Sequence, residues 1–194
     1  VDIFYTFEQT DTEQFIKQIL HKYYNIPNAE ICKSINGKPY IKGDKVFFNA
    51  THSKGLLALA VGKRQVGLDC ECLDGKARPA VLSKFSEREK REIHCTGDFY
   101  EHWTAREAYI KYLGLTLASD WRRVEYCKGK IHYCGNLQEL PVLCFKIGNY
   151  TLAVCGHYSK LNIEKYNFVL PPCFSPEISL TAIHPRAHMT NCPL

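Results

Sequence analysis

Two apolar runs joined by a polar turn constrain the fold of this chain most strongly. Residues 56–61 consist of Leu, Ala and Val, residues 66–72 carry an apolar side chain at every second position, and the polar residues 62–65 separate the two segments. Short apolar runs bounded by turn residues are typical of buried strands. We therefore expect two central strands connected by a turn at Gly62–Arg64.

Helical spacing of apolar residues predicts three helices around these strands. Apolar residues recur three and four positions apart in residues 11–24 and again in 98–113, where Gly114 is a natural C-terminal stop. The pattern Asp98-x-x-Glu101 is expected to cap the second of these helices. A Ser-x-x-Glu capping box at Ser86 predicts a further helix over residues 86–95.

The remaining segments favour strands and turns. Residues 121–158 contain two consecutive hairpin patterns, and further short strands are expected at 1–7, 29–35 and 45–49. Thr51, His52 and Ser53 follow the last of these and are expected to form a loop.

The composition excludes several classes of protein. Apolar residues make up 45% of the 194 residues and charged residues 23%, which excludes a disordered chain. No window approaches 18 consecutive apolar residues, and no signal peptide is visible. The ten cysteines include no C-x-x-C pair, so we expect reduced thiols and a cytoplasmic protein. The net charge of +5 is dispersed, so no nucleic-acid or membrane partner is expected.

The C-terminal residues differ in composition from the rest of the chain. Residues 171–194 hold five of the nine prolines and show no periodicity. We interpret them as an extended tail.

Asp69 and Glu71 are the first candidates for chemistry. Alternate residues of a strand share a face, so these two carboxylates point the same way, about 7 Å apart. Two carboxylates on one face of a strand are suitable ligands for a hard divalent ion, most plausibly Mg²⁺. Taken alone, the pattern is more typical of an exposed acidic strand face.

Glu107 and Lys111 form the second candidate pair. Four residues apart on a helix, they share one face, where a carboxylate can bind a metal while the ammonium contacts a phosphate oxygen. A simple surface ion pair is the alternative interpretation. Thr51 and His52 supply a hydroxyl and an imidazole that suit a phosphate, although a lone histidine is often structural. Lys38, in a Gly-Lys-Pro turn, is a solvated lysine when considered by itself.

The order of these motifs resembles the 4′-phosphopantetheinyl transferase superfamily, and within it the surfactin-synthetase-activating type. The resemblance runs from about residue 37 to 117 and rests on G-K-P, F-N-x-T-H-S, G-x-D-x-E, F-S-x-x-E and W-T-x-R-E-A-x-x-K. It implies an α+β fold of two similar α/β halves about a pseudo-twofold axis, with the active site at their junction. The corresponding division is 1–62 for the N-terminal half, 63–170 for the C-terminal half and 171–194 for the tail.

The resemblance also implies roles for individual residues. Asp69, Glu71 and Glu107 correspond to the Mg²⁺ ligands, and Glu107 is also the candidate base. Four side chains would hold coenzyme A. Lys111, His52 and Thr51 would contact its phosphates, and Lys38 would lie near its nucleotide. Glu107, Lys111 and His52 are the residues expected to take part in catalysis.

The implied reaction transfers phosphopantetheine from coenzyme A to a serine of an apo acyl or peptidyl carrier protein and releases 3′,5′-ADP. The chain departs from the family pattern in a shortened N-terminal half and in Arg106, where lysine is usual. The alternatives are a Mg²⁺-dependent nucleotide phosphohydrolase and a non-catalytic coenzyme A-binding relative. A monomer is expected.

Overall fold

The computed structural model describes residues 1–43, 46–73, 75 and 79–168. The predicted tail at 171–194 therefore lies outside the described residues, as does Lys45. Within the described part, no helix combines the length and the apolar character needed to cross a membrane.

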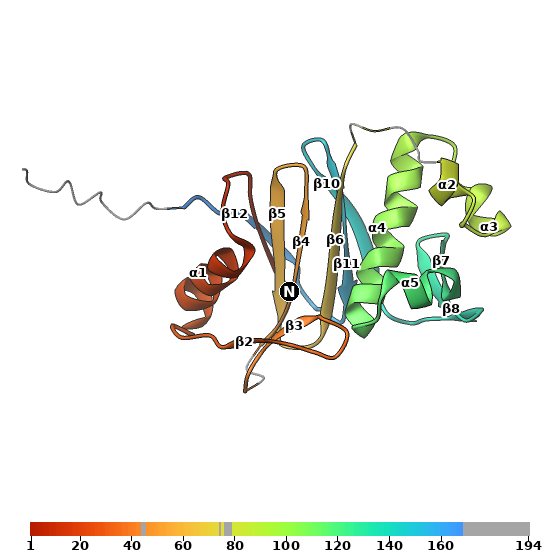
Figure 1. The fold of residues 1–194 in the computed structure, drawn as a ribbon. Coiled ribbons are helices and arrows are strands. Elements are labelled where there is room, and N and C mark those ends of the chain that lie inside the picture. Colours follow the sequence, from red (N-terminus) through yellow and green to blue (C-terminus); the bar gives the residue numbers. More distant parts are fainter. Residues whose placement is uncertain (44–45, 74, 76–78, 169–194) are drawn as a thin grey trace, which may run out of the picture.

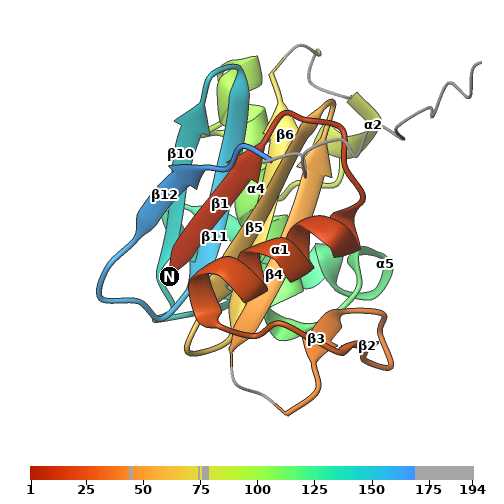
Figure 2. The same ribbon diagram turned by 90° about the vertical axis from the view of Figure 1, so that its left-hand side faces the viewer.

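Four strands form the first sheet, in the order β12-β1-β5-β4. Their bounds are Asn162–Lys165, Asp2–Thr6, Leu56–Gly62 and Phe47–Ser53. Helix α1, Thr12–Tyr24, crosses one face of this sheet (Figure 2) and buries Phe15, Ile16, Ile19 and Leu20. The side-chain carboxylate of Asp11 caps the helix by accepting a hydrogen bond from the Gln14 amide.

Three strands form the second sheet, in the order β10-β11-β6. These are Val142–Ile147, Tyr150–Gly156 and Val66–Cys72. Helix α4, Thr96–Leu113, packs against this sheet on the side away from α1 (Figure 1). The short strands β2, Ile31–Lys33, and β3, Pro39–Ile41, pair as a hairpin below the sheets.

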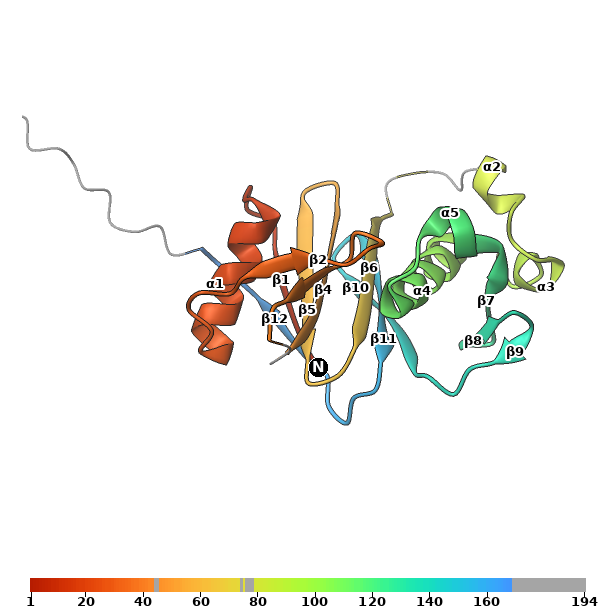
Figure 3. The same cartoon turned by 60° about the horizontal axis from the view of Figure 1, so that its bottom comes forward.

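A smaller layer covers the outer side of α4 (Figure 3). It contains the third sheet, β7-β8-β9, with strands Val124–Cys127, Lys130–Tyr133 and Asn136–Leu137. It also contains α2, Pro79–Leu82; α3, Glu87–Lys90; α5, Leu117–Asp120; and the 3₁₀ turn η1, Trp121–Arg123.

The two main sheets meet through side chains rather than through a backbone ladder. Asn49 of β4 accepts a hydrogen bond from the Leu68 amide of β6, at 2.7 Å from Oδ1. Ser53 of β4 accepts another from the Cys72 amide, at 3.2 Å from Oγ. These polar side chains satisfy backbone donors at the edge of β6 and hold the edge of β4 beside it.

The mixed α+β class is confirmed, as are the two central strands and both hairpins in residues 121–158. The pseudo-twofold axis and the division into halves stay predictions. Strand β12 lies in the predicted C-terminal half, yet it pairs in parallel with β1 of the first sheet. Tyr166, which follows β12, packs in the apolar cluster under α1.

Two expected helix boundaries are wrong. The helix predicted over residues 86–95 is reduced to α3, Glu87–Lys90, although its Ser86–Glu89 capping box is present. Helix α4 begins before Asp98, because Cys95 is its N-cap and Asp98 closes the capping box from the third helical position. A cysteine thiol is an unusual cap, so the first turn carries little sequence signal.

Arg106 joins α4 to the outer layer. Its guanidinium is fully buried and bonds the Glu89 carboxylate at 3.0 Å, and it also donates to the Trp121 carbonyl. It lies over the rings of Phe85 and Trp121, at 4.8 and 3.9 Å from their centroids. One side chain therefore fixes α3, α4 and η1 to one another.

We expect Arg106→Ala to lower the free energy of unfolding by about 3–5 kcal/mol, because it leaves the Glu89 carboxylate buried without its cation. Arg88→Ala is the matched control, since Arg88 pairs with Glu125 while both side chains are partly exposed, and it should cost less than about 1 kcal/mol. Urea unfolding monitored by circular dichroism measures both. Equal losses for the two variants would contradict the buried role of Arg106.

Candidate functional site

Helix α4 approaches β6 unusually closely at Gly67. A Cβ atom built at this glycine would lie 1.9 Å from the carbonyl oxygen of Ala108 and 2.5 Å from the amide nitrogen of Tyr112. No side chain fits there, so glycine lets the helix backbone rest directly on the strand. This contact brings the residues that follow on β6 within reach of side chains on α4.

Asp69 and Lys111 form the centre of the site. The Lys111 ammonium donates to Oδ1 of Asp69 at 2.6 Å and to the Thr51 hydroxyl at 3.3 Å. Thr51 in turn donates to the same carboxylate oxygen at 3.2 Å. Three elements, β4, β6 and α4, therefore contribute to one buried cluster.

Charge and burial oppose each other in this pair. Burial raises the pKa of Asp69, against the lowering effect of the Lys111 charge. Burial alone would lower the pKa of Lys111, but the charges of Asp69 and Glu107 hold it above its ordinary value. The ammonium is therefore retained because the carboxylates surround it.

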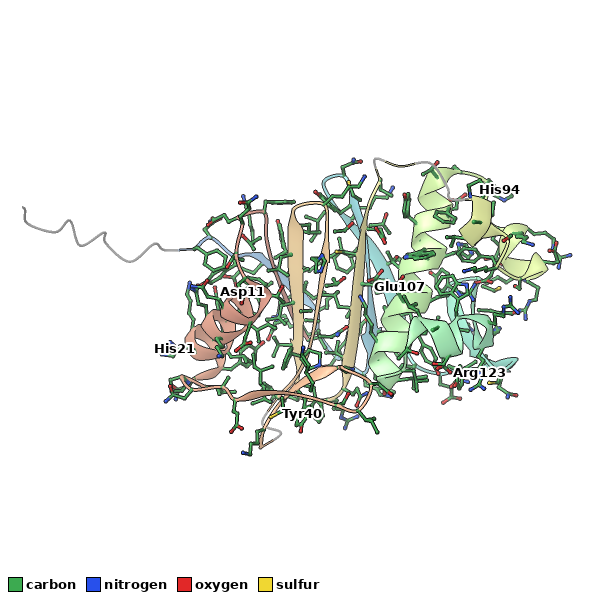
Figure 4. The ribbon with its side chains drawn as sticks, viewed as in Figure 1. Asp11, His21, Tyr40, His94, Glu107 and Arg123 are labelled. Carbon is green, nitrogen blue, oxygen red and sulfur yellow. The ribbon has the colours of Figure 1, made fainter. Side chains whose placement is uncertain are left out.

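Glu107 lies one helical turn before Lys111, and Figure 4 shows it between α4 and β6. Its carboxylate is 4.0 Å from the Lys111 ammonium. Burial and, next, the charge of Asp69 raise the pKa of Glu107 to about 8, and Glu71 adds to the shift. This carboxyl group is consequently close to its titration point near neutral pH.

Glu71 occupies the next position on the same face of β6. The Ser53 hydroxyl donates to its carboxylate at 3.0 Å. Asn49, Thr51 and Ser53 alternate along β4, and each bonds a different position of β6. This alternation of polar residues is readable in the sequence as N-x-T-x-S, a signal that identifies Asn49 beside the hydroxyl residues Thr51 and Ser53.

The carboxylates fit a divalent cation by their chemistry. Oδ2 of Asp69 is buried and has no hydrogen-bond partner among the described residues. The mutual repulsion that raises the Glu107 pKa is of the kind that a bound cation relieves. Within the described part of the chain, however, no three acidic, His or Cys side chains already form a metal-binding group. In the present arrangement Lys111 is the cation that contacts Asp69.

His52 is not brought to this cluster. The expected loop at residues 51–53 is wrong, because β4 continues through Ser53. Neighbouring residues of a strand point to opposite faces, so Thr51 points toward Asp69 while the exposed His52 points away. The role predicted for His52 therefore has no support from the geometry of the cluster.

Lys38 is also apart from the carboxylates. Its ammonium contacts backbone carbonyls, at 2.5 Å from Lys111 O and 3.2 Å from Val66 O. Burial lowers the pKa of Lys38 to about 8. The side chain thus binds the C-terminal turn of α4, where carbonyl groups lack helical partners.

A cavity of about 300 Å³ opens beside Lys38. The β2–β3 hairpin contributes Pro39 and Tyr40, and the start of β6 and the end of α4 contribute Val66 and Gly114. Its size and mixed lining are typical of a small-molecule site.

The raised pKa of Glu107 gives a testable pH dependence. The Glu107 carboxyl group binds its proton more tightly in the folded state than in the unfolded state. The folded protein therefore loses stability as the pH rises from the ordinary pKa near 4.5 toward about 8. At pH 5 the melting temperature of Glu107→Gln should equal that of the wild type. At pH 8.5 it should be higher, by roughly 2–4 °C for each kcal/mol of unfolding free energy that the wild type loses. Differential scanning calorimetry in EDTA measures this. A variant that is less stable than the wild type at pH 8.5 would contradict the shift.

Comparison with known proteins relates this geometry to a class of enzymes. Residues 65–155 match the family model of the 4′-phosphopantetheinyl transferase superfamily. The chain is 32% identical over 110 residues to the 4′-phosphopantetheinyl transferase gsp of Aneurinibacillus migulanus, covering 53% of this chain and 46% of that protein. It is 31% identical over 115 residues to the 4′-phosphopantetheinyl transferase HetI of a Nostoc species, covering 51% and 48%.

A third relative gives the same result. The 4′-phosphopantetheinyl transferase pptA of Paxillus involutus is 30% identical over 120 residues, covering 47% of this chain and 46% of that protein. The chain thus spans about half the length of the curated relatives it matches. The matches support the superfamily for the segment that carries Asp69, Glu71, Glu107 and Lys111.

Proposed function

We propose that this protein transfers the 4′-phosphopantetheine group of coenzyme A to a serine of an apo carrier protein and releases 3′,5′-ADP. The observation that carries the proposal is the partly buried contact of Lys111 with Asp69, beside Glu107, inside the segment similar to the transferases. Fixed charges at a pyrophosphate are the main requirement of such a reaction.

Lys111 and Glu107 have separate tasks in this proposal. Lys111 donates to an oxygen of the pyrophosphate and stabilises the charge that develops on it. Glu107 accepts the proton of the attacking serine hydroxyl as the general base. Asp69 positions the Lys111 ammonium through the 2.6 Å contact, and Thr51 supports the same ammonium.

Asp69, Glu71 and Glu107 are the side chains that would hold Mg²⁺. A bound Mg²⁺ supplies charge neutralisation for the pyrophosphate oxygens. Three carboxylates leave coordination positions for water and phosphate oxygens, as Mg²⁺ requires.

The nucleotide end of coenzyme A is placed, in this proposal, at the cavity beside Lys38. The cavity adjoins the end of α4 that carries Lys111, so one ligand could reach both. The proposed acceptor is an acyl or peptidyl carrier protein. We further propose that the enzyme is of the surfactin-synthetase-activating type, monomeric and cytoplasmic.

The product 3′,5′-ADP tests the proposal against hydrolysis. With coenzyme A and Mg²⁺, transfer should release 3′,5′-ADP only when an apo carrier protein is also present. A phosphohydrolase would release nucleotide without the carrier, because water is its acceptor. Chromatographic quantification of 3′,5′-ADP with and without carrier separates the two, and release independent of carrier would contradict transfer.

A further inference from the structure

The ammonium group of Lys38 donates to three backbone carbonyl groups. Its Nζ atom lies 2.5 Å from the carbonyl oxygen of Lys111, 3.2 Å from that of Val66 and 3.3 Å from that of Tyr112. A lysine ammonium has three N–H donors and no acceptor. The three carbonyl groups therefore match all the hydrogen bonds that this side chain can donate.

Two of these carbonyl groups belong to the last turn of α4. The last carbonyl groups of a helix have no helical partner, and the helix dipole places partial negative charge on them. Gly114 ends α4 with a φ of 70°, and a Cβ atom built on it would lie 3.6 Å from Cδ of Lys38. The aliphatic stem of Lys38 thus lies against the end of the helix, and its cation contacts the free carbonyl groups.

Two neighbouring side chains hold the same turn. The side-chain amide of Asn36 donates to the carbonyl of Gly114 at 2.9 Å, and that of Gln65 donates to the carbonyl of Tyr112. Asn36 and Lys38 both lie in the connection between β2 and β3. This hairpin therefore binds the end of α4 at two points.

Lys111 is consequently held at both of its ends. Its carbonyl oxygen accepts from Lys38, and its ammonium donates to Oδ1 of Asp69 at 2.6 Å. A lysine stem is long and flexible, so holding the backbone as well as the ammonium restricts where the charge can lie.

We propose that Lys38 is a positioning residue, which holds the backbone of Lys111 and thereby keeps the Lys111 ammonium at the site of the coenzyme A pyrophosphate. The inference rests on the proposed function, which makes coenzyme A the donor. Lys38 then acts on the donor through Lys111. It makes no hydrogen bond of its own to the nucleotide, although the cavity proposed for the nucleotide lies beside it.

A double-mutant cycle on coenzyme A binding, measured by titration calorimetry, tests this role. Lys38→Ala should weaken binding about tenfold, an ordinary coupling for residues in contact. In the Lys111→Ala background it should change the affinity by less than about twofold, because the residue through which it acts is gone. Lys42→Ala is the matched control, since Lys42 follows β3 and pairs with Glu30 while both side chains are exposed. It should leave the affinity unchanged.

A second measurement needs no coenzyme A. Hydrogen exchange of the amides in the last turn of α4, followed by NMR, should be faster in Lys38→Ala, because the turn has lost a partner. Asn36→Ala should give a smaller increase in the same amides. Asn36 is exposed, so this variant should stay folded even if Lys38→Ala does not. Its effect on coenzyme A binding should also vanish in the Lys111→Ala background.

Four outcomes decide the matter. Losses from Lys38→Ala and Lys111→Ala that multiply would overturn the inference and leave the proposed function intact, because Lys38 would then contact coenzyme A by itself. Unchanged exchange in the last turn of α4 in both hairpin variants would also overturn it. A wild-type protein that binds coenzyme A and shows the non-additive cycle, yet transfers nothing to a carrier protein, would support the inference and contradict the proposed function. A wild-type protein that does not bind coenzyme A would contradict both.

Discussion

Replacing Asp69 with alanine should reduce phosphopantetheine transfer by about 10²–10³-fold or more, the loss typical of removing a preorganised electrostatic group. Asp69 accepts from Lys111 and from Thr51, and it is the most buried of the three carboxylates proposed to bind Mg²⁺. Its removal should also abolish the rise in melting temperature that Mg²⁺ gives the wild type. Steady-state transfer assays and thermal unfolding with and without Mg²⁺ measure the two effects.

Asp69→Asn and Asp2→Ala are the companion variants. Asp69→Asn keeps the size of the side chain and loses its charge, so it should be inactive while folded. Asp2 also lies in a strand and bonds Tyr24 and Asn162 outside the candidate site, so Asp2→Ala should keep its activity. Full activity of either Asp69 variant, or of the wild type in excess EDTA, would rule out the proposed metal site.

Lys111 and Glu107 should have different kinetic signatures. Lys111→Ala removes a charge-assisted contact to the pyrophosphate and should weaken coenzyme A binding about 10- to 100-fold, in line with 1.5–3 kcal/mol. Glu107→Gln should lower kcat by about 10²–10⁴-fold and change coenzyme A affinity less, because it removes a base. Titration calorimetry beside turnover measurements separates affinity from rate.

Lys130→Ala is the matched control for Lys111, since Lys130 is exposed on β8 of the outer layer. It should leave affinity and rate unchanged. If Lys111→Ala behaved in the same way, Lys111 would be part of a structural ion pair with Asp69 and the proposed contact to phosphate would be wrong.

The sequence predicts the two residue pairs at the centre of the site, because each pair lies within a single strand or helix whose period is readable in the sequence. Strand alternation places Asp69 and Glu71 on one face, and helical spacing does the same for Glu107 and Lys111. The structure adds the contact between the two pairs through Gly67, whose missing Cβ lets α4 rest on β6. The glycine and the helix were both visible in the sequence, but the contact between them was not.

Tertiary contacts explain the loop prediction that failed and a contact of Lys38 that the sequence does not predict. His52 was expected in a loop, but pairing with β5 extends β4 through residue 53 and turns this side chain away from Asp69. Lys38 looks solvated in its turn, yet its ammonium reaches the carbonyls of Lys111 and Tyr112, more than seventy residues away. No local pattern reports such a contact.

Intact mass spectrometry of an apo carrier protein tests the central claim most directly. After incubation with this protein, coenzyme A and Mg²⁺, the carrier should gain the mass of one phosphopantetheine group, located on its acceptor serine. A carrier with that serine replaced by alanine should gain nothing, and Asp69→Asn should leave the wild-type carrier in its apo form. A carrier that stays unmodified while 3′,5′-ADP accumulates, or one modified equally by Asp69→Asn, would contradict the account.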